Sequence, residues 1–325
     1  MGIMAKKRPL HKRLKYFLLY LLVKGLLFMA YILPRKVVLH FCGFLGRMAF
    51  YLIKDARKKT ILHLELVYGK EKSKEEILRM AKRVFIMIGK NAGDIMRSVN
   101  IFDIQAFQNV VRVTGEEHLH KALEAKKGVI VLTAHVGAFE LVATYLALMD
   151  YCPQIIGTKL KDTRLNQLIT QNRSRRGAEA IERGKDTLKV MRNLKLGGLL
   201  VMLIDQDTKV KSVFVDFMGM PASTPIGAAL LALRTGAKVI PMGIYLDENN
   251  QQQMKIYPEL EIKYSGNEEK DILINTLALS KATEKLIAHD PTQWVWMHER
   301  WKTQEVPSIS PNSAEYPKFS PLKNK

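Results

Sequence analysis

Short apolar runs alternate with amphipathic stretches through the chain from residue 110 onward. GVIVLTA at 128–134, GLLVMLID at 198–205 and KVIPMGIY at 238–245 are continuously apolar, as strands buried on both faces are. Stretches with a helical period lie between them, for example at 138–149. This alternation predicts an α/β fold with a mostly parallel central sheet flanked by helices.

The same patterns place the remaining elements of this region. We expect further strands at 110–113, 154–158 and 254–262, and further helices at 116–126, 162–175, 185–195, 225–235 and 268–289. A long loop is expected after residue 205. Ser73 and Glu76 form a capping-box pattern, which predicts a helix over 74–98.

Leu14–Leu33 is an apolar run of twenty residues, preceded by basic residues and followed by Pro34. As a helix it would be ~30 Å long, the hydrocarbon thickness of a bilayer. The central Lys24 costs ~3 kcal/mol on insertion, whereas the surrounding apolar residues gain ~4–7 kcal/mol. A buried core helix and a cleaved signal peptide are alternatives to a retained anchor. An anchor could span the bilayer, or lie in its interface with the Lys24 ammonium at the headgroups.

These boundaries divide the chain into three parts. Residues 1–35 form a basic arm and anchor helix, and 36–305 form a single domain with a helical part at 36–109 and an α/β core at 110–305. Residues 36–60 mix apolar and basic side chains, which fits a helix on a membrane or anionic ligand, or a solvated helix face. The tail at 306–325 is rich in Ser, Pro, Asn and Lys and is predicted to be disordered.

The charge balance indicates an anionic partner. The 325 residues include 51 Lys and Arg against 31 Asp and Glu, a formal charge of +20. A membrane, a phosphorylated ligand and nucleic acid all fit this excess. Nucleic acid is disfavoured because aromatic residues do not interleave with the basic clusters. Cys42 and Cys152 are the two cysteines, too few for a disulfide scaffold or a cysteine-based metal site.

A candidate catalytic pair follows the strand at 128–134. His135 leaves that strand, Gly137 permits a tight turn, and Glu140 begins the next helix. Ligands of open α/β sheets bind at this edge, and a carboxylate on one imidazole nitrogen makes the other nitrogen a better base. With no G-x-S-x-G motif, the hydroxyl that fits is the substrate's own. A structural role for the two residues fits the same pattern.

Two polar stretches can join this pair. Residues 159–195 hold eleven Lys or Arg against four acids. One arginine there could stabilise an oxyanion or bind a phosphate, while most belong to a basic surface. Asp205, Gln206 and Asp207 end another strand and suit either substrate recognition or a structural turn. No zinc-binding H-E-x-x-H motif accompanies His135.

His135 and Glu140 resemble the H-x-x-x-x-D/E signature of the lysophospholipid and glycerol-phosphate acyltransferases. The chain is most similar to the late lauroyl/myristoyl acyltransferases of lipid A biosynthesis. Supporting stretches are LIDQD at 203–207, the segment 212–241 and QWVWMHERWK at 293–302. Many members have H-x-G-N-W-E where this chain has Gly137-Ala138-Phe139-Glu140, and Arg-Pro where it has Lys159-Leu160. These departures leave the acceptor and the acyl-chain length open.

The resemblance implies a glycerol-phosphate acyltransferase-like fold and transfer of a fatty acyl group from acyl carrier protein to a hydroxyl of a lipid A precursor. It implies His135 as general base, Glu140 as its partner, and Arg173 at the oxyanion or substrate phosphate, with Arg175 as the alternative. It implies an anchor in the cell inner membrane with the body at the cytoplasmic face. Attack on a thioester needs no metal or redox cofactor, and the positive charge suits an acidic carrier, an anionic glycolipid and a membrane. Trp294, Trp296 and Trp301 are expected either at the membrane interface or in the packing of the C-terminal helix.

Overall fold

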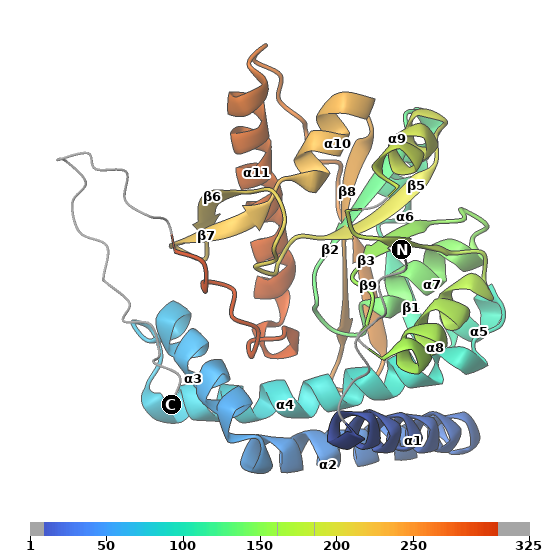
Figure 1. Cartoon of the computed structure of the whole chain (residues 1–325), viewed down its shortest axis with the longest axis vertical. Helices are drawn as coiled ribbons and strands as arrows, with labels where there is room; N and C mark the ends of the chain where they lie inside the picture. The colour runs from blue at the N-terminus through green and yellow to red at the C-terminus, as the bar shows by residue number, and fades with distance from the viewer. Residues whose placement is uncertain (1–9, 161, 185, 305–325) are drawn as a thin grey trace.

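A seven-stranded sheet forms the centre of the computed structural model, which describes residues 10–160, 162–184 and 186–304 (Figure 1). The strand order is β1-β9-β8-β2-β5-β3-β4, and every neighbouring pair is parallel except β8 with β9. The strands are β1 (Val111–Thr114), β2 (Val129–Thr133), β3 (Gln154–Gly157), β4 (Glu179–Glu182), β5 (Leu199–Leu203), β8 (Lys238–Leu246) and β9 (Gln252–Ile256). The predicted α/β fold with a mostly parallel sheet is therefore confirmed.

Helices cover both faces of the sheet, because successive residues of each strand point to opposite sides. Val129 and Val131 of β2 pack with the helices on one face, and Ile130 and Leu132 pack with those on the other. The first face carries α5 (Ile104–Gln108), α6 (Glu116–Glu124) and α7 (Glu140–Leu148); the second carries α9 (Thr187–Lys195), α10 (Gly227–Thr235) and α11 (Glu268–His289). Burial on both faces explains why the central strands are continuously apolar.

The segment after residue 205 is not the long loop that the sequence predicts. It contains an antiparallel hairpin of β6 (Ser212–Phe217) and β7 (Met220–Pro225). The two turn residues, Met218 and Gly219, have positive φ angles of 54° and 81°. Hairpin turns of this kind favour Asn-Gly or Asp-Gly, so a methionine at the first position hides the turn from sequence analysis.

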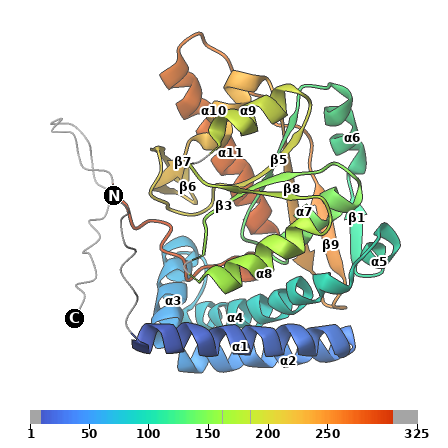
Figure 2. The ribbon, with the colours of Figure 1, turned by 45° about the vertical axis from the view of Figure 1, so that its right-hand side comes forward.

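Four helices form a layer across the end of the sheet where β8 and β9 meet (Figure 1). This helical layer comprises α1 (Leu10–Ile32), α2 (Arg35–Leu52), α3 (Lys54–Tyr68) and α4 (Lys74–Arg97). The capping box of Ser73 and Glu76 is present at the start of α4, as predicted. The sequence predicts a single helix at 36–60, but the structure has two helices there, α2 and α3. The angle between them is 90°. Figure 2 shows α1 and α2 side by side along the layer.

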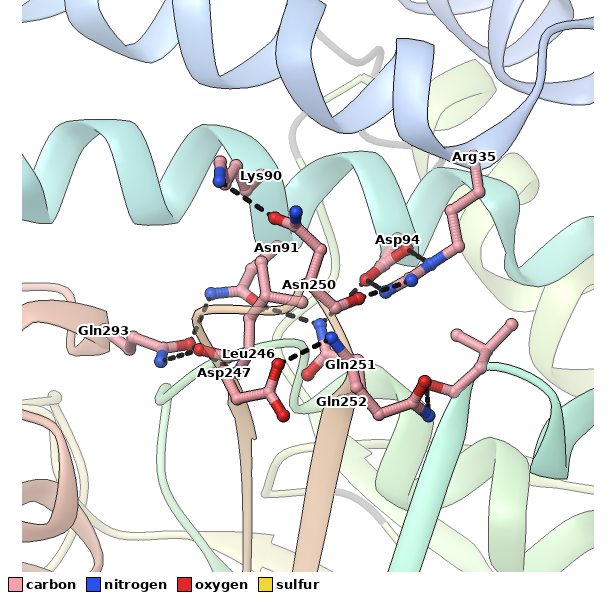
Figure 3. A network of polar contacts seen from close by, with 11 residues as sticks. Arg35, Lys90, Asn91, Asp94, Leu246, Asp247, Asn250, Gln251, Gln252 and Gln293 are labelled. Carbon is pink, nitrogen blue, oxygen red and sulfur yellow. Dashed lines mark hydrogen bonds and ion pairs between the residues drawn. The ribbon is translucent and has the colours of Figure 1, made fainter.

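A buried polar network joins the helical layer to the sheet (Figure 3). Arg35 at the start of α2 donates to both carboxylate oxygens of Asp94, at 2.7 and 2.6 Å. The side-chain amide of Gln252 donates to Asp94 and to Asn91, at 2.9 and 3.0 Å. Asn91 in turn donates to Gln293 at 2.9 Å, in the short helix η2 (Pro291–Gln293). The network therefore connects α2, α4 and β9 to the segment that borders the candidate site.

Candidate active site

Parallel pairing of β2 with β5 places His135 beside Asp205. The register pairs Thr133 with Leu203, and His135 and Asp205 each lie two residues beyond that pair. Nδ1 of His135 lies 2.8 Å from Oδ1 of Asp205. The backbone N–H of His135 donates to the second oxygen, Oδ2, also at 2.8 Å. The imidazole is thus fixed at the carboxyl edge of the sheet, where α/β proteins bind their ligands.

Asp205 is fully buried and its carboxylate also accepts a hydrogen bond from Nε1 of Trp294, at 2.8 Å. A carboxylate can only accept, so the contact with Nδ1 keeps the proton on that nitrogen and leaves Nε2 as the basic atom. The His135 side chain is 24% exposed. The arrangement therefore presents an oriented base to an incoming ligand.

The surroundings strengthen this base. Burial alone lowers the pKa of His135, but the charge of Asp205 and its hydrogen bond outweigh burial, so the pKa of His135 is raised above its ordinary value. Burial also opposes ionisation of Asp205, yet its contacts with His135 and Trp294 lower its pKa to about 2. At neutral pH Asp205 is ionised and stabilises a proton taken up by His135.

The turn after His135 has the tight geometry expected at Gly137. Its φ is +60°, and a Cβ there would lie 1.9 Å from the carbonyl oxygen of Ile244. Its N–H donates to the carbonyl of Gln293 at 3.1 Å, and Val136 forms a β-bridge with Trp294. Only glycine fits this close approach without strain. The segment 293–294 therefore holds the turn and, through the indole, the carboxylate of Asp205.

Glu140 does not hold the imidazole, which corrects the expected His135–Glu140 pair. Nε of Arg173 donates to its Oε2 at 3.0 Å, and Nη2 donates to its Oε1 at 2.5 Å. This bidentate ion pair joins the start of α7 to the end of α8 (Thr163–Ser174). Asp205 takes the place beside Nδ1 that we expected Glu140 to occupy. The charge of Glu140 still acts on His135 and contributes to raising its pKa.

The other predicted site residues have different surroundings. Arg175 is exposed and lies over the ring of Phe102, at 5.9 Å. Asp207 accepts from the backbone N–H of Thr303 at 2.8 Å, and Gln206 is half-buried. Asp205 is fully buried and contacts His135. The expectation that it binds substrate is therefore wrong. The substrate-binding roles of Arg175, Gln206 and Asp207 stay predictions.

Trp294 and Trp296 are fully buried, so the expectation of a membrane interface is wrong for both. They pack in a cluster with α2, α3, α4, α11 and the β6–β7 hairpin, and Trp301 is half-buried beside it. The indole of Trp294 is a site residue that the sequence did not indicate. It lies 89 residues from Asp205 in the chain, and no local pattern connects the two.

Comparisons with known proteins find a family model and several proteins that are similar to this chain. Residues 4–303 match the family model described as bacterial lipid A biosynthesis acyltransferase. The lipid A biosynthesis lauroyltransferase of Escherichia coli is 28% identical over 307 residues, 92% of this chain and 96% of that protein. A lipid A biosynthesis acyltransferase of Haemophilus influenzae is 23% identical over 90% of this chain and 89% of that protein. A phosphatidylinositol mannoside acyltransferase of Mycobacterium tuberculosis is 26% identical over 193 residues, 58% of this chain and 59% of that protein.

Proposed function

Because this chain belongs to the bacterial lipid A biosynthesis acyltransferase family, we propose that it transfers a fatty acyl group from acyl carrier protein to a hydroxyl of a lipid A precursor. The observation that carries the proposal is the contact between His135 and Asp205, which leaves Nε2 as a base at the ligand-binding edge of the sheet. The match to the lauroyltransferase over 96% of its length favours lipid A as the acceptor class.

In the proposed reaction, Nε2 of His135 takes the proton of the acceptor hydroxyl as its oxygen attacks the thioester carbonyl. The carbonyl becomes a tetrahedral oxyanion, and Asp205 stabilises the imidazolium that forms. Collapse of the intermediate breaks the carbon–sulfur bond, and the imidazolium returns the proton to the leaving thiolate. The ester and the free thiol are the products, and the step uses no cofactor.

Arg173 is the proposed donor to the oxyanion. The carboxylate of Glu140 accepts hydrogen bonds from Nε and Nη2 of the Arg173 guanidinium. This bidentate contact fixes the direction of the third nitrogen, Nη1. Nη1 faces Gly157 at the end of β3, 3.7 Å from where a Cβ on that glycine would lie. A donor held in advance costs no reorganisation when charge develops on the carbonyl oxygen. In this proposal Glu140 contributes to catalysis by positioning Arg173.

We place the protein at the inner membrane with its body on the cytoplasmic face. Within the described residues, α1 is the one unbent helix long and apolar enough to cross a bilayer. Its end is tied to the body, because Arg97 donates to the carbonyls of Ala30 and Leu33. Its first half contacts Arg164, whose guanidinium lies over Phe17 and Tyr20. A helix that lies along the body in this way suits the membrane interface better than a span.

The outer side of α2 is a second apolar surface that could contact the membrane. Large apolar side chains recur there at helical spacing and are exposed, namely Val37, Phe41, Phe44, Met48, Tyr51 and Leu52. Lys36 and Arg47 of the same helix and Lys54, Arg57 and Lys58 of α3 supply positive charge near it. Apolar side chains with basic neighbours are typical of helices that lie in anionic bilayers.

Purified full-length protein tests the activity directly. The reaction supplies acyl carrier protein loaded with a fatty acid and a phosphorylated lipid A precursor, and mass spectrometry measures the lipid product. We expect the wild type to add one acyl chain, and His135→Ala to add none while it keeps its folded circular dichroism spectrum. Arg234→Gln, an exposed substitution on α10, is the matched control and should leave the rate unchanged. Near wild-type transfer by His135→Ala would overturn the mechanism.

The acceptor and the donor are tested in the same assay. Transfer to phosphatidylinositol mannoside but not to the lipid A precursor would reassign the acceptor, as the mycobacterial relatives would suggest. Transfer from acyl-coenzyme A at a rate equal to that from the carrier protein would contradict a carrier-specific donor site. Lipid profiles of cells with and without the protein check the same assignment in the native membrane.

Flotation with lipid vesicles tests the membrane surface. We expect the wild type to float with vesicles that contain phosphatidylglycerol, and the double variant Phe41→Asp/Phe44→Asp to lose most of this binding. The matched control is Leu273→Asp/Leu277→Asp, which changes two similarly exposed apolar residues on α11. Equal binding by both double variants would contradict a membrane role for α2.

A further inference from the structure

We infer that Gln293 is a positioning residue of the active site, and that an ion pair in the helical layer sets the direction of its side-chain amide. The inference deepens the proposed function and rests on it, because it takes His135 as the reacting base. Gln293 is 2% exposed, so it acts through the residues that it holds and not by contact with a substrate.

The segment at Gln293 holds the active site at two points. The carbonyl oxygen of Gln293 accepts the N–H of Gly137 at 3.1 Å, in the turn that follows His135. The next residue, Trp294, donates from Nε1 to Oδ2 of Asp205 at 2.8 Å. A displacement of this segment would therefore move both the turn after the base and the carboxylate that orients the base.

The side chain of Gln293 is fixed by four hydrogen bonds. Its Oε1 accepts from the N–H of Leu246 at 3.0 Å and from Nδ2 of Asn91 at 2.9 Å. Its Nε2 donates to the carbonyl of Leu246 at 2.9 Å and to Oδ2 of Asp290 at 2.7 Å. Every donor and acceptor position of the amide is then used. Leu246 ends β8, the strand beside β2, so these contacts tie Gln293 to the sheet that carries His135.

The direction of this amide follows from a series of hydrogen bonds that begins at Asp94 (Figure 3). Asp94 is paired with Arg35, and a carboxylate can only accept hydrogen bonds, so Gln252 must turn its NH₂ group toward Asp94. The same NH₂ group donates to Oδ1 of Asn91, which leaves Nδ2 of Asn91 to donate to Gln293. Each amide in the series therefore points in the direction that the ion pair requires.

The amide oxygen of Gln252 supports this order of cause and effect. It is buried and has no hydrogen-bond partner among the described residues. A buried acceptor without a partner is unfavourable, so the contacts of the NH₂ group, and not those of the oxygen, decide how this amide lies. Its contact with Asp94 can do so because hydrogen bonds to a charged group are stronger than neutral ones.

The helical layer thus contributes to catalysis without touching the reacting groups. Loss of an amide from the series should loosen the segment at Gln293 and, with it, the contact of Trp294 with Asp205. The contact of Asp205 with the imidazole is what raises the pKa of His135, so a loosened Asp205 should let that pKa fall. A defect that affects folding alone would not change the titration of the molecules that remain folded.

Matched methionine variants of three glutamines test the inference. Methionine is unbranched like glutamine, and it removes the amide. Gln293→Met and Gln252→Met each remove one member of the series. The control is Gln253→Met, because Gln253 is the next residue of β9 and its amide donates to Asp247 instead. Thermal unfolding of the full-length protein measures the stability of each variant separately from its effect on the site.

The first readout is the pH titration of the His135 imidazole, which does not depend on turnover. It is followed by NMR in histidine-labelled protein, with His135→Gln used for assignment. We expect a midpoint above the ordinary histidine value of about 6.5 in the wild type and in Gln253→Met, and a fall toward that value in Gln293→Met and Gln252→Met.

A wild-type midpoint in folded Gln293→Met would overturn the inference. If Gln293→Met does not fold, the comparison of Gln252→Met with Gln253→Met decides, and equal midpoints in these two would overturn it. A midpoint that falls in Gln293→Met and stays at the wild-type value in Gln252→Met would refute the role of the ion pair.

The second readout is the rate of acyl transfer. We expect kcat of Gln293→Met and Gln252→Met to fall roughly three- to thirtyfold, with both KM values within about threefold of wild type. Gln253→Met should keep the wild-type kcat. A lowered His135 midpoint in these variants of a protein that transfers no acyl chain would support the inference and refute the proposed function. Acyl transfer by a protein whose His135 midpoint is the same in all variants would do the reverse.

Discussion

The imidazole of His135 and the carboxylate of Asp205 lie 2.8 Å apart because two parallel strands end in register beneath them. The sheet fixes both backbones, and Trp294 holds the second carboxylate oxygen. The base and its partner therefore lie at the ends of two strands that are hydrogen-bonded to each other in the central sheet. The turn after Gly137 starts α7 at Glu140, where its carboxylate reaches Arg173 instead.

The raised pKa of His135 predicts the pH profile of acyl transfer. The base must be neutral to accept a proton, so kcat/KM should rise with pH as the imidazolium loses its proton. Because the pKa is raised by Asp205, the midpoint of that rise should lie above the ordinary histidine value of about 6.5. Initial rates between pH 5.5 and 9 measure it. A midpoint at or below the ordinary value would contradict the role assigned to Asp205.

A double-mutant cycle tests whether Glu140 acts through Arg173. Glu140→Ala and Arg173→Ala should each lower kcat, and the double variant should be little worse than Arg173→Ala, because Glu140 acts only through the ion pair with Arg173. The expected coupling is about 1–3 kcal/mol in activation free energy. The exposed Arg175, two residues away, is the control partner and should show losses that add to those of Glu140→Ala. Additive losses for Glu140 and Arg173 would refute the positioning role.

The ion pair of Arg35 with Asp94 should contribute strongly to stability. Asp94 is 1% exposed and its partner 20%, so Asp94→Ala leaves a partly buried guanidinium without its counter-charge. We expect a loss of about 3 kcal/mol in the free energy of unfolding. Glu268→Ala breaks the exposed pair with Arg234 and should cost less than about 1 kcal/mol. Denaturant unfolding of the full chain in detergent compares the two, and equal losses would contradict a structural role for the network.

The central strands could be predicted from the sequence because strands that are buried on both faces consist almost entirely of apolar residues. β2, β5 and β8 are apolar at nearly every position and were placed within about two residues of their ends. β4 was missed because this edge strand of four residues, Glu179–Glu182, has one buried apolar side chain, Ile181. The hairpin of β6 and β7 was missed because its Met218-Gly219 turn has no asparagine or aspartate.

The site was only half predictable for a different reason. His135 could be placed because it lies two residues beyond a buried strand, and Gly137 because the turn requires it. The partner of His135 depends on which strand lies beside β2, and local sequence does not encode strand order. Glu140 is near His135 in the chain, whereas Asp205 is 70 residues away and closer in space. The indication that was present is that both His135 and Asp205 follow apolar strands at the same offset.

The most direct test of the account is the rate of acyl transfer by Asp205→Asn. Two N–H groups, from His135 and Trp294, point at Oδ2, so the amide oxygen should occupy that position and the NH₂ group should face Nδ1. Nδ1 must then accept a hydrogen bond, which moves the ring proton to Nε2 and removes the base. We predict a fall in kcat of roughly 10³–10⁴ with the fold intact. A rate within a few-fold of wild type would contradict the central claim that Asp205 makes His135 the base.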